Sequence, residues 1–417
     1  MSDSTTLPDD EKPVSRWGLP KVRGHARFLA AGGIDSLGSG LLFAFQVVYF
    51  ARTTSMSLVE VGLALTVAQL LAIPAPTLFG PLVDRFGPRA VAASGNLVAG
   101  AGFVAYLFAD EFWHVALMGL VVQVGVSAYW TSYGSLVALA STADQRTRWF
   151  GLMQAMRNAG VGLGGALAAL VVGVGGVEWM NWLLIANAVS YVLAAWLLIS
   201  WHPAPVVDED EEHASSSDEE ERAGYVAVLR DGAFMRLVAV NFVFVLSAMV
   251  LSVLLAIYIV ETIEGMVWLA GVLLTVNTVL VAVMQPAVAG WVERRPAPRV
   301  IAAAAVLNAV GFAVFGFVGI LPGWLVIPGM VVAILIYTLA ELVQSPAVSA
   351  LSVSLSPPAR RGRHLAVFQL SWNVGGAVAP VVFTTLLSYG SGWPWVLLTV
   401  LSLLSVFVLG GHRGRTS

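Results

Sequence analysis

Three ionisable side chains stand inside long apolar stretches of the sequence. They are Asp35 in GGIDSLGSG, Arg157 in MQAMRNAG and Glu341 in YTLAELVQS. An apolar environment disfavours the charged form of a carboxyl group, so such a group binds a proton readily. Protonation also removes most of the free energy that burial of the charge would require. The two acids are therefore candidates for reversible proton binding, and Arg157 is a candidate partner for one of them.

Helical geometry places Asp35 and Arg157 at nearly the same depth. Asp35 lies about 12 Å beyond Arg27 along a helix, and Arg157 lies roughly 13 Å beyond Arg148. A contact between them would stabilise the ionised carboxylate, but the pair could also be a permanent salt bridge that fixes helix packing. Glu341 has its own alternative, a protonated carboxyl group that is hydrogen-bonded within the C-terminal half.

The composition identifies the setting of these residues as a membrane. The chain has 417 residues, of which 58% are hydrophobic and 11% are charged, whereas soluble domains carry about 25% charged residues. A helix needs roughly 20 apolar residues to cross a bilayer, and the chain contains twelve runs of about that length. The predicted spans are Phe28–Phe50, Val59–Leu82, Ala90–Ala109, Trp113–Ala138, Phe150–Val174, Trp179–Ile199, Leu237–Val260, Val267–Val292, Val300–Ile320, Trp324–Leu351, Leu365–Leu387 and Trp393–Leu409.

The distribution of Lys and Arg predicts the orientation of these spans. With the N-terminus in the cytoplasm, only Arg52 falls in an outer loop and only Arg157 lies within a span. All the other basic residues are then cytoplasmic, as the positive-inside rule requires. We therefore expect both termini in the cytoplasm and a multi-pass protein of a bacterial cytoplasmic membrane. The first run has full span length and follows a charged leader, so we do not expect it to be a cleaved signal peptide.

A polar segment divides the chain into two parts of similar size. PAPVVDEDEEHASSSDEEERAG has the composition of a disordered linker, and we expect it to solvate the connection between the halves. A short amphipathic helix over Tyr225–Met235 is predicted to follow it on the membrane surface. The predicted organisation is a leader (1–27), an N-terminal bundle (28–201), the acidic linker (202–224), a C-terminal bundle (225–411) and a tail (412–417).

Two internal matches indicate that the halves arose by duplication. GPLVDRFGPR, residues 80–89, recurs as GWVERRPAPR, residues 290–299. Further on, WFGLMQAMRNAG aligns with HLAVFQLSWNVG. This second match pairs Gln154 with Gln369, Asn158 with Asn373, Gly160 with Gly375 and Arg148 with Arg363.

The first copy resembles the loop signature G-x-L-A-D-R-x-G-R-R of the major facilitator superfamily, although Val83 replaces its small residue and Pro88 one of its basic residues. The resemblance implies an all-α membrane protein with twelve transmembrane helices in two pseudo-symmetric six-helix bundles. It also implies that spans one and five are neighbours. It further implies a conformational latch in which the acid faces the start of span eleven, where a helix N-terminus favours an anion, while Arg85 and Arg89 add contacts. The predicted latch residues are Gly80, Asp84, Arg85, Gly87, Arg89, Gly290 and Arg294; a purely topogenic role for this loop is the alternative.

Two further patterns resemble those of facilitator exporters. Glu341 and Pro346 match the E-x-x-x-x-P pattern of drug exporters, and Gly151, Gly160 and Gly164 match part of a glycine-rich antiporter signature. Such glycines are expected to let span five pack closely across to the other half. Span four lacks the arginine that many drug:proton antiporters carry there, so Arg157 is the only cation predicted within the membrane.

Polar and aromatic residues within the spans are candidates for a substrate cavity. A flexible apolar cavity with scattered hydrogen-bonding groups suits amphipathic ligands, whereas the alternative is that these side chains serve packing and interfacial belts. The predicted cavity residues are Gln46, Tyr129, Trp130, Tyr133, Asn158, Asn241, Tyr337, Trp372 and Asn373.

Together these patterns favour a monomeric secondary transporter that uses Asp35, Glu341 and Arg157 for proton coupling. We expect proton-coupled efflux of amphipathic drugs or secondary metabolites. The alternatives are a carrier of one small metabolite, such as a sugar, amino acid or organic acid, and a receptor or enzyme without transport. The sequence has no phosphate-binding loop and no cysteine, and we expect no catalytic residue, metal, cofactor or nucleic-acid partner.

Overall fold

The computed structural model describes residues 19–43, 45–176, 179–203, 224–262, 266 and 268–410. Most of the predicted leader, of the acidic linker and of the tail lies outside these residues, so the limits of those segments remain predictions. The described residues form helices and connecting turns, with no β-strand among them. The all-α fold class predicted from the apolar runs is confirmed.

The first half of the chain forms one bundle. Its elements are α1 (Ala26–Phe43), α2 (Gln46–Thr53), α3 (Leu58–Leu71), α4 (Ala75–Phe86), α5 (Pro88–Ala105), the 3₁₀ turn η2 (Tyr106–Phe108), α6 (Phe112–Ala140), α7 (Arg146–Gly175) and α8 (Met180–Ser200). Helix α1 packs against α7 and α8, and α5 packs against α6 and α8. The predicted neighbourhood of spans one and five is thus present as the contact between α1 and α7.

The second half forms a bundle of the same kind. Its elements are α10 (Tyr225–Arg230), α11 (Gly232–Met249), the π-turn η4 (Val250–Leu254), α12 (Leu255–Thr262), α13 (Trp268–Glu293), α14 (Ala297–Val318), α15 (Gly323–Ser354), the 3₁₀ turn η5 (Pro358–Arg360), α16 (Arg361–Tyr389) and α17 (Trp393–Gly410). Helix α14 packs against α15 and α17, and α11 packs against α16.

The helices agree with the twelve predicted spans. Nine spans in the described part are long and apolar enough to cross a membrane, and eleven are counted when the bent pairs α1/α2 and α3/α4 each form one span. Helix α17 corresponds to the twelfth, and its apolar stretch Trp393–Val408 is shorter than the others. The bend of 45° between α3 and α4 lies next to Pro74, which has no backbone N–H to continue the helix.

The predicted amphipathic helix over Tyr225–Met235 is shorter than expected. Helix α10 ends at Arg230, and the carboxylate of Asp231 accepts hydrogen bonds from the backbone N–H groups of Ala233 and Phe234 at 3.0 and 3.1 Å. An aspartate in this position caps the N-terminus of a new helix. Asp231 therefore ends the surface segment and begins α11.

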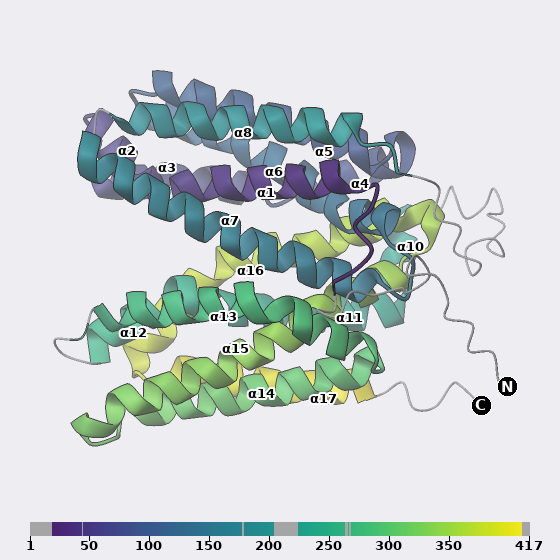
Figure 1. Cartoon of the computed structure of the whole chain (residues 1–417). Helices are drawn as coiled ribbons and strands as arrows, with labels where there is room; N and C mark the ends of the chain where they lie inside the picture. Colours follow the sequence, from purple (N-terminus) through teal and green to yellow (C-terminus); the bar gives the residue numbers. More distant parts are fainter. Residues whose placement is uncertain are drawn as a thin grey trace, which may run out of the picture.

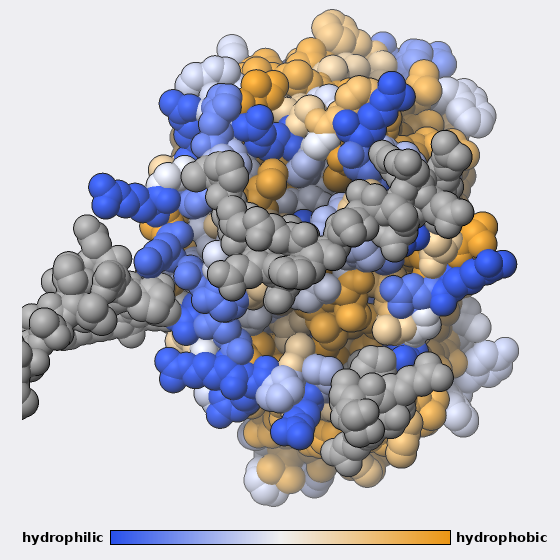
Figure 2. Space-filling model, turned by 90° about the vertical axis from the view of Figure 1, so that its right-hand side faces the viewer, coloured by the Kyte–Doolittle hydropathy of each residue, from blue (hydrophilic) through white to orange (hydrophobic). Residues whose placement is uncertain are grey.

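The two bundles contact each other mainly through α4 with α16 and α7 with α13. In Figure 1 they converge at the end that carries α4, α10 and α11, and they lie apart at the end that carries α2 and α12. Figure 2 views the converging end, where many hydrophilic side chains lie between apolar surfaces at the upper and lower edges. Exposed arginines lie in its loops and at its helix ends, among them Arg85, Arg230, Arg294, Arg295 and Arg299; we call it the basic end.

Candidate functional site

A cavity of about 250 Å³ lies between the two bundles. Helices α6 and α7 line it from the first half, and α11, α15 and α16 line it from the second. Its walls combine aromatic rings with amide and hydroxyl groups. The lining residues are Trp130, Tyr133, Gly134, Phe150, Gln154, Arg157, Asn241, Phe244, Ala248, Glu341, Gln344, Ser345, Val348, Ser349, Ser352, Leu365, Phe368, Gln369 and Trp372.

Arg157 faces this cavity rather than an acid. Its side chain is exposed, and its guanidinium carbon lies 4.5 Å from the centre of the Trp130 ring. This distance is that of a cation–π contact. The flat face of the indole therefore holds the cation at the cavity wall.

Asp35 lies behind Arg157 and is not among the lining residues. It is partly buried and close enough to Arg157 to interact with it electrostatically. The structure shows no ion pair between the two within 4 Å, and Asp35 Oδ1 is buried without a hydrogen-bond partner among the described residues. The direct contact predicted between Asp35 and Arg157 is thus absent, because the guanidinium lies over Trp130 instead.

Glu341 reaches the cavity from α15. Its Oε2 atom accepts a hydrogen bond of 2.7 Å from the side-chain amide of Asn277 on α13, and the same amide lies 3.1 Å from the hydroxyl of Thr338. One turn further along α15, Gln344 accepts a bond of 2.8 Å from Asn308 on α14. Neutral amides of neighbouring helices therefore orient both polar groups of α15.

Four of the predicted cavity residues line the cavity. Trp130 and Tyr133 do so from α6, Asn241 from α11 and Trp372 from α16. The side-chain amide of Asn241 also donates a bond of 2.7 Å to the hydroxyl of Ser371, which links α11 to α16.

The other five predicted cavity residues are not among the lining residues. The Tyr337 hydroxyl donates to the carbonyl of Ser247 at 3.1 Å inside the second bundle, and Gln46 bonds the hydroxyl of Tyr106 at 3.3 Å near α2. These side chains satisfy polar groups within one bundle, which residue type alone does not distinguish from a cavity wall. Tyr129 is likewise buried in the first bundle, and Asn158 and Asn373 lie on the cavity helices α7 and α16 but are not among the lining residues.

Several lining residues were not predicted from the sequence. Gln154 and Gln369 occupy equivalent places on α7 and α16, and they are identical residues in the internal repeat. Ser345, Ser349 and Ser352 follow one another at helical spacing along the cavity face of α15. The identity of the two glutamines and the spacing of the serines were the signals that could have found them.

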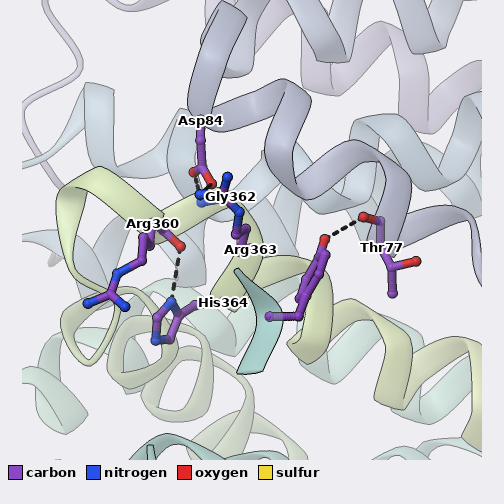
Figure 3. A network of polar contacts seen from close by, with 7 residues as sticks. Thr77, Asp84, Arg360, Gly362, Arg363 and His364 are labelled. Carbon is purple, nitrogen blue, oxygen red and sulfur yellow. Dashed lines mark hydrogen bonds and ion pairs between the residues drawn. The ribbon is translucent and has the colours of Figure 1, made fainter. Parts of the chain in front are cut away.

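At the basic end, the last turn of α4 is bonded to the start of α16. Oδ1 of Asp84 accepts a hydrogen bond of 2.6 Å from the backbone N–H of Gly362, and Oδ2 lies 3.1 Å from the guanidinium of Arg363 (Figure 3). The positive end of a helix dipole and a charged side chain thus meet one carboxylate. The acid therefore faces the start of span eleven, as the resemblance implied.

A tyrosine adds a second bond between the halves beside this one. The Tyr225 hydroxyl, on α10, donates to the carbonyl oxygen of Thr77 on α4, the contact drawn at the right of Figure 3. Burial raises the pKa of the Tyr225 phenol to about 12, so the hydroxyl keeps the proton that it donates. Gly80 makes room for this contact, since a Cβ atom there would lie 2.5 Å from the Tyr225 hydroxyl and 2.9 Å from the Cβ of Ala366.

The internal repeat supplies a counterpart to the Asp84 pair. Arg148, at the start of α7, forms an ion pair with Glu293 at the end of α13. Arg148 is the repeat equivalent of Arg363, whereas Glu293 precedes by one residue the position equivalent to Asp84, which is Arg294. Because the acid is displaced in this way, the alignment pointed to Arg294, which is exposed, and missed Glu293.

The other predicted latch residues contact their own half. Arg89 donates to the carbonyl of Trp201 at the end of α8, and Arg85 is exposed, with its guanidinium 5.2 Å from the Phe86 ring. Within the part of the chain that the structure describes, the cross-half contacts predicted for these two arginines are therefore not seen. Gly87 has a φ of 81° between α4 and α5, which suits glycine, and Gly290 is buried in α13.

Only one of the three predicted packing glycines faces the other half. A Cβ atom at Gly151 would collide with Ala289 of α13, whereas Gly160 and Gly164 face α1 in their own bundle, at Ser36 and Leu37. The glycine pattern therefore describes chiefly the contact between α1 and α7. The prediction that it serves packing across the halves was wrong for Gly160 and Gly164.

Sequence comparison agrees with this architecture. The profile of the Major Facilitator Superfamily matches residues 28–340 and 237–413. The chain belongs to the major facilitator superfamily. This facilitator is thus a multi-pass membrane transporter, and members of its family are transporters rather than enzymes.

The facilitator is similar over most of its length to several characterised proteins. It is 24% identical over 396 residues to a Na(+), Li(+), K(+)/H(+) antiporter of Planococcus maritimus, covering 88% of this chain and 90% of the antiporter. It is 23% identical over 394 residues to the multidrug resistance protein MdtH of Escherichia coli, covering 90% of each chain. A solved bacterial homologue of the iron transporter ferroportin, in an outward-facing state, has a TM-score of 0.76 at 14% identity, covering 94% of this chain and all of that one.

Proposed function

We propose that this facilitator exports amphipathic drugs or secondary metabolites from a bacterium in exchange for protons. The observation that carries the proposal is the position of Glu341, a single acid on the wall of an aromatic cavity between the two halves. An acid in that position alternates between a protonated and a charged form as the cavity opens to one side or the other. Cargo and proton then occupy the same site in turn.

The contacts at the basic end support alternating access as the mechanism of this transport. Asp84 with Arg363 and Arg148 with Glu293 each join the two halves, and both pairs must separate before the cavity opens at that end. We place the basic end in the cytoplasm, because the basic residues gather there. In this orientation the structure is closed toward the cytoplasm.

Transport in membrane vesicles tests the proposal. We expect an imposed proton gradient to drive an amphipathic dye against its concentration gradient, and a protonophore to abolish this movement. Glu341→Gln should abolish uphill transport while sparing downhill exchange of dye. Glu60→Gln is the matched control, because Glu60 accepts a bond of 2.8 Å from the Ser57 N–H at the start of α3, a capping role that glutamine also fills.

Asp35 is the second acid in this scheme, behind the cavity wall. Asp35→Asn should also abolish uphill transport and spare exchange. A double variant, Asp35→Asn with Glu341→Gln, that keeps the normal pH dependence of uphill transport would remove both acids from the mechanism. Proton-driven movement of a sugar, an amino acid or an organic acid, with no movement of amphipathic dyes, would instead favour a carrier of one small metabolite.

A further inference from the structure

One basic and one acidic side chain face the same cavity, one from each half. Arg157 comes from α7 in the first bundle, and Glu341 comes from α15 in the second. The remaining described lining residues are neutral, Tyr133 being the only other ionisable group among them. With both groups charged, the lining has no net charge but is strongly dipolar.

Neither charge is compensated by the protein. No described acid lies within ion-pair distance of Arg157, and its guanidinium rests on the Trp130 ring, a contact that leaves its N–H groups available. Glu341 forms no ion pair within the described residues and accepts its hydrogen bond from the neutral amide of Asn277. Arg157 is exposed and Glu341 is partly buried, so both groups are available to a ligand in the cavity.

We propose that the cargo of this site is a compact amphipathic zwitterion. Its anionic group, a carboxylate or similar, binds Arg157, its ammonium group binds Glu341, and its aromatic or apolar body packs against the rings of Trp130 and Trp372. This inference rests on the proposed export function and names its substrate class. The cavity volume of about 250 Å³ lies just below the usual range of ~300–1,000 Å³ for ligand sites, which favours a compact molecule.

Charge balance favours a zwitterion over a simple cation or anion. A cation at Glu341 would leave Arg157 without a partner, and an anion at Arg157 would leave Glu341 without one. A cargo with both groups satisfies both residues and keeps the site neutral. Asp35 lies within electrostatic range of Arg157 from behind, but it is not a lining residue and does not reach the guanidinium.

The same arrangement explains how a proton could displace the cargo. Protonation of Glu341 removes the negative charge that holds the ammonium group, so proton and amine compete for one carboxylate. The ionisable groups that face Glu341 are Tyr337 on its own helix and Arg157 and Tyr133 across the cavity. Competition of this kind makes the transport an exchange rather than a co-transport.

A matched set of three small probes tests the inference in binding experiments on the purified full-length protein in nanodiscs. Para-(aminomethyl)benzoate carries both charges, its methyl ester keeps only the ammonium, and its N-acetyl derivative keeps only the carboxylate. Binding is followed by calorimetry at neutral pH. We expect the zwitterion to bind about tenfold or more tightly than either derivative, since hydrogen bonds to charged groups are the stronger ones.

Two substitutions assign each end of the probe. Arg157→Gln should lower the affinity for the zwitterion by about tenfold and leave the affinity for the methyl ester unchanged. Glu341→Gln should lower the affinity for the zwitterion and leave that for the N-acetyl derivative unchanged. Arg52→Gln is the matched control, because Arg52 is exposed on α2 away from the cavity.

The results separate this inference from the proposed function. Equal affinity for the zwitterion and its ester in the unsubstituted protein, or equal weakening of both by Arg157→Gln, would overturn the zwitterion inference. If vesicles still move a cationic dye against a proton gradient in that case, the export function stands without it. A zwitterion preference that follows both substitutions, in a protein with no proton-driven transport, supports the inference and refutes the proposed coupling.

Discussion

Asp84 offers the sharpest test of how the basic end stays closed. Asp84→Asn keeps an oxygen that accepts the Gly362 N–H bond, but it removes the charge that faces Arg363 and the start of α16. A hydrogen bond to a charged group contributes about 1.5–3 kcal/mol, and a charge at a helix N-terminus about 0.3–1 kcal/mol. Because asparagine keeps the neutral part of these contacts, we expect a loss of about 2 kcal/mol. That loss shifts the equilibrium toward the open form about thirtyfold.

The absence of cysteine from the chain makes this shift measurable. Ser352 lines the cavity and is 2% exposed, so a single Ser352→Cys substitution reports whether the basic end is open. A membrane-impermeant maleimide applied from that side should label Asp84→Asn protein about thirtyfold faster than protein with Asp84 intact. Asp110→Asn is the matched control, because Asp110 is exposed at the other end. Equal labelling rates with and without the Asp84 charge would refute the latch.

Two further predictions concern packing around the cavity. In double-mutant cycles on thermal stability, Arg157 and Trp130 should couple by about 0.5–2 kcal/mol as a cation–π pair. Arg157 and Asp35, which interact electrostatically without a direct contact, should couple more weakly than that pair; a stronger coupling of Arg157 to Asp35 would indicate a salt bridge. Gly160→Ala should destabilise the protein by about 1–3 kcal/mol, because its Cβ would lie 2.7 Å from a Cβ atom of α1. Gly162→Ala, on the same helix with 3.8 Å to its nearest neighbour, should not, and equal losses in the two variants would contradict the geometry.

The fold could be predicted because the features that determine it are local and repeated. Long apolar runs separated by charged loops can bury their backbone polar groups in a bilayer only as helices. The duplicated loop and the Gln154/Gln369 match then related the two halves. The contact of Asp84 with the start of α16 was also predicted, although from a family resemblance rather than from the residues alone.

The site was predicted less completely because lining a cavity depends on which way a helix face points. Tyr337 and Trp372 both stand in apolar spans, yet one donates within its own bundle and the other faces the cavity. Glu293 was missed for a different reason. It stands one residue before the repeat equivalent of Asp84, yet it still pairs with an arginine of the other half. The equal depth of Arg157 and Asp35 in the membrane likewise suggested a contact between them. Depth does not determine whether a flexible side chain contacts an acid or an aromatic ring.

The two ion pairs between the halves are removed from water in the closed form. Asp84 and Arg148 are only 8% and 4% exposed there, and their partners Arg363 and Glu293 are 19% and 16% exposed. Stripping four charges of their hydration offsets much of the attraction within each pair. The two ion pairs consequently stabilise the closed form by much less than their short distances suggest. Because this stabilisation is small, the binding of one ligand molecule can shift the protein from the closed to the open form.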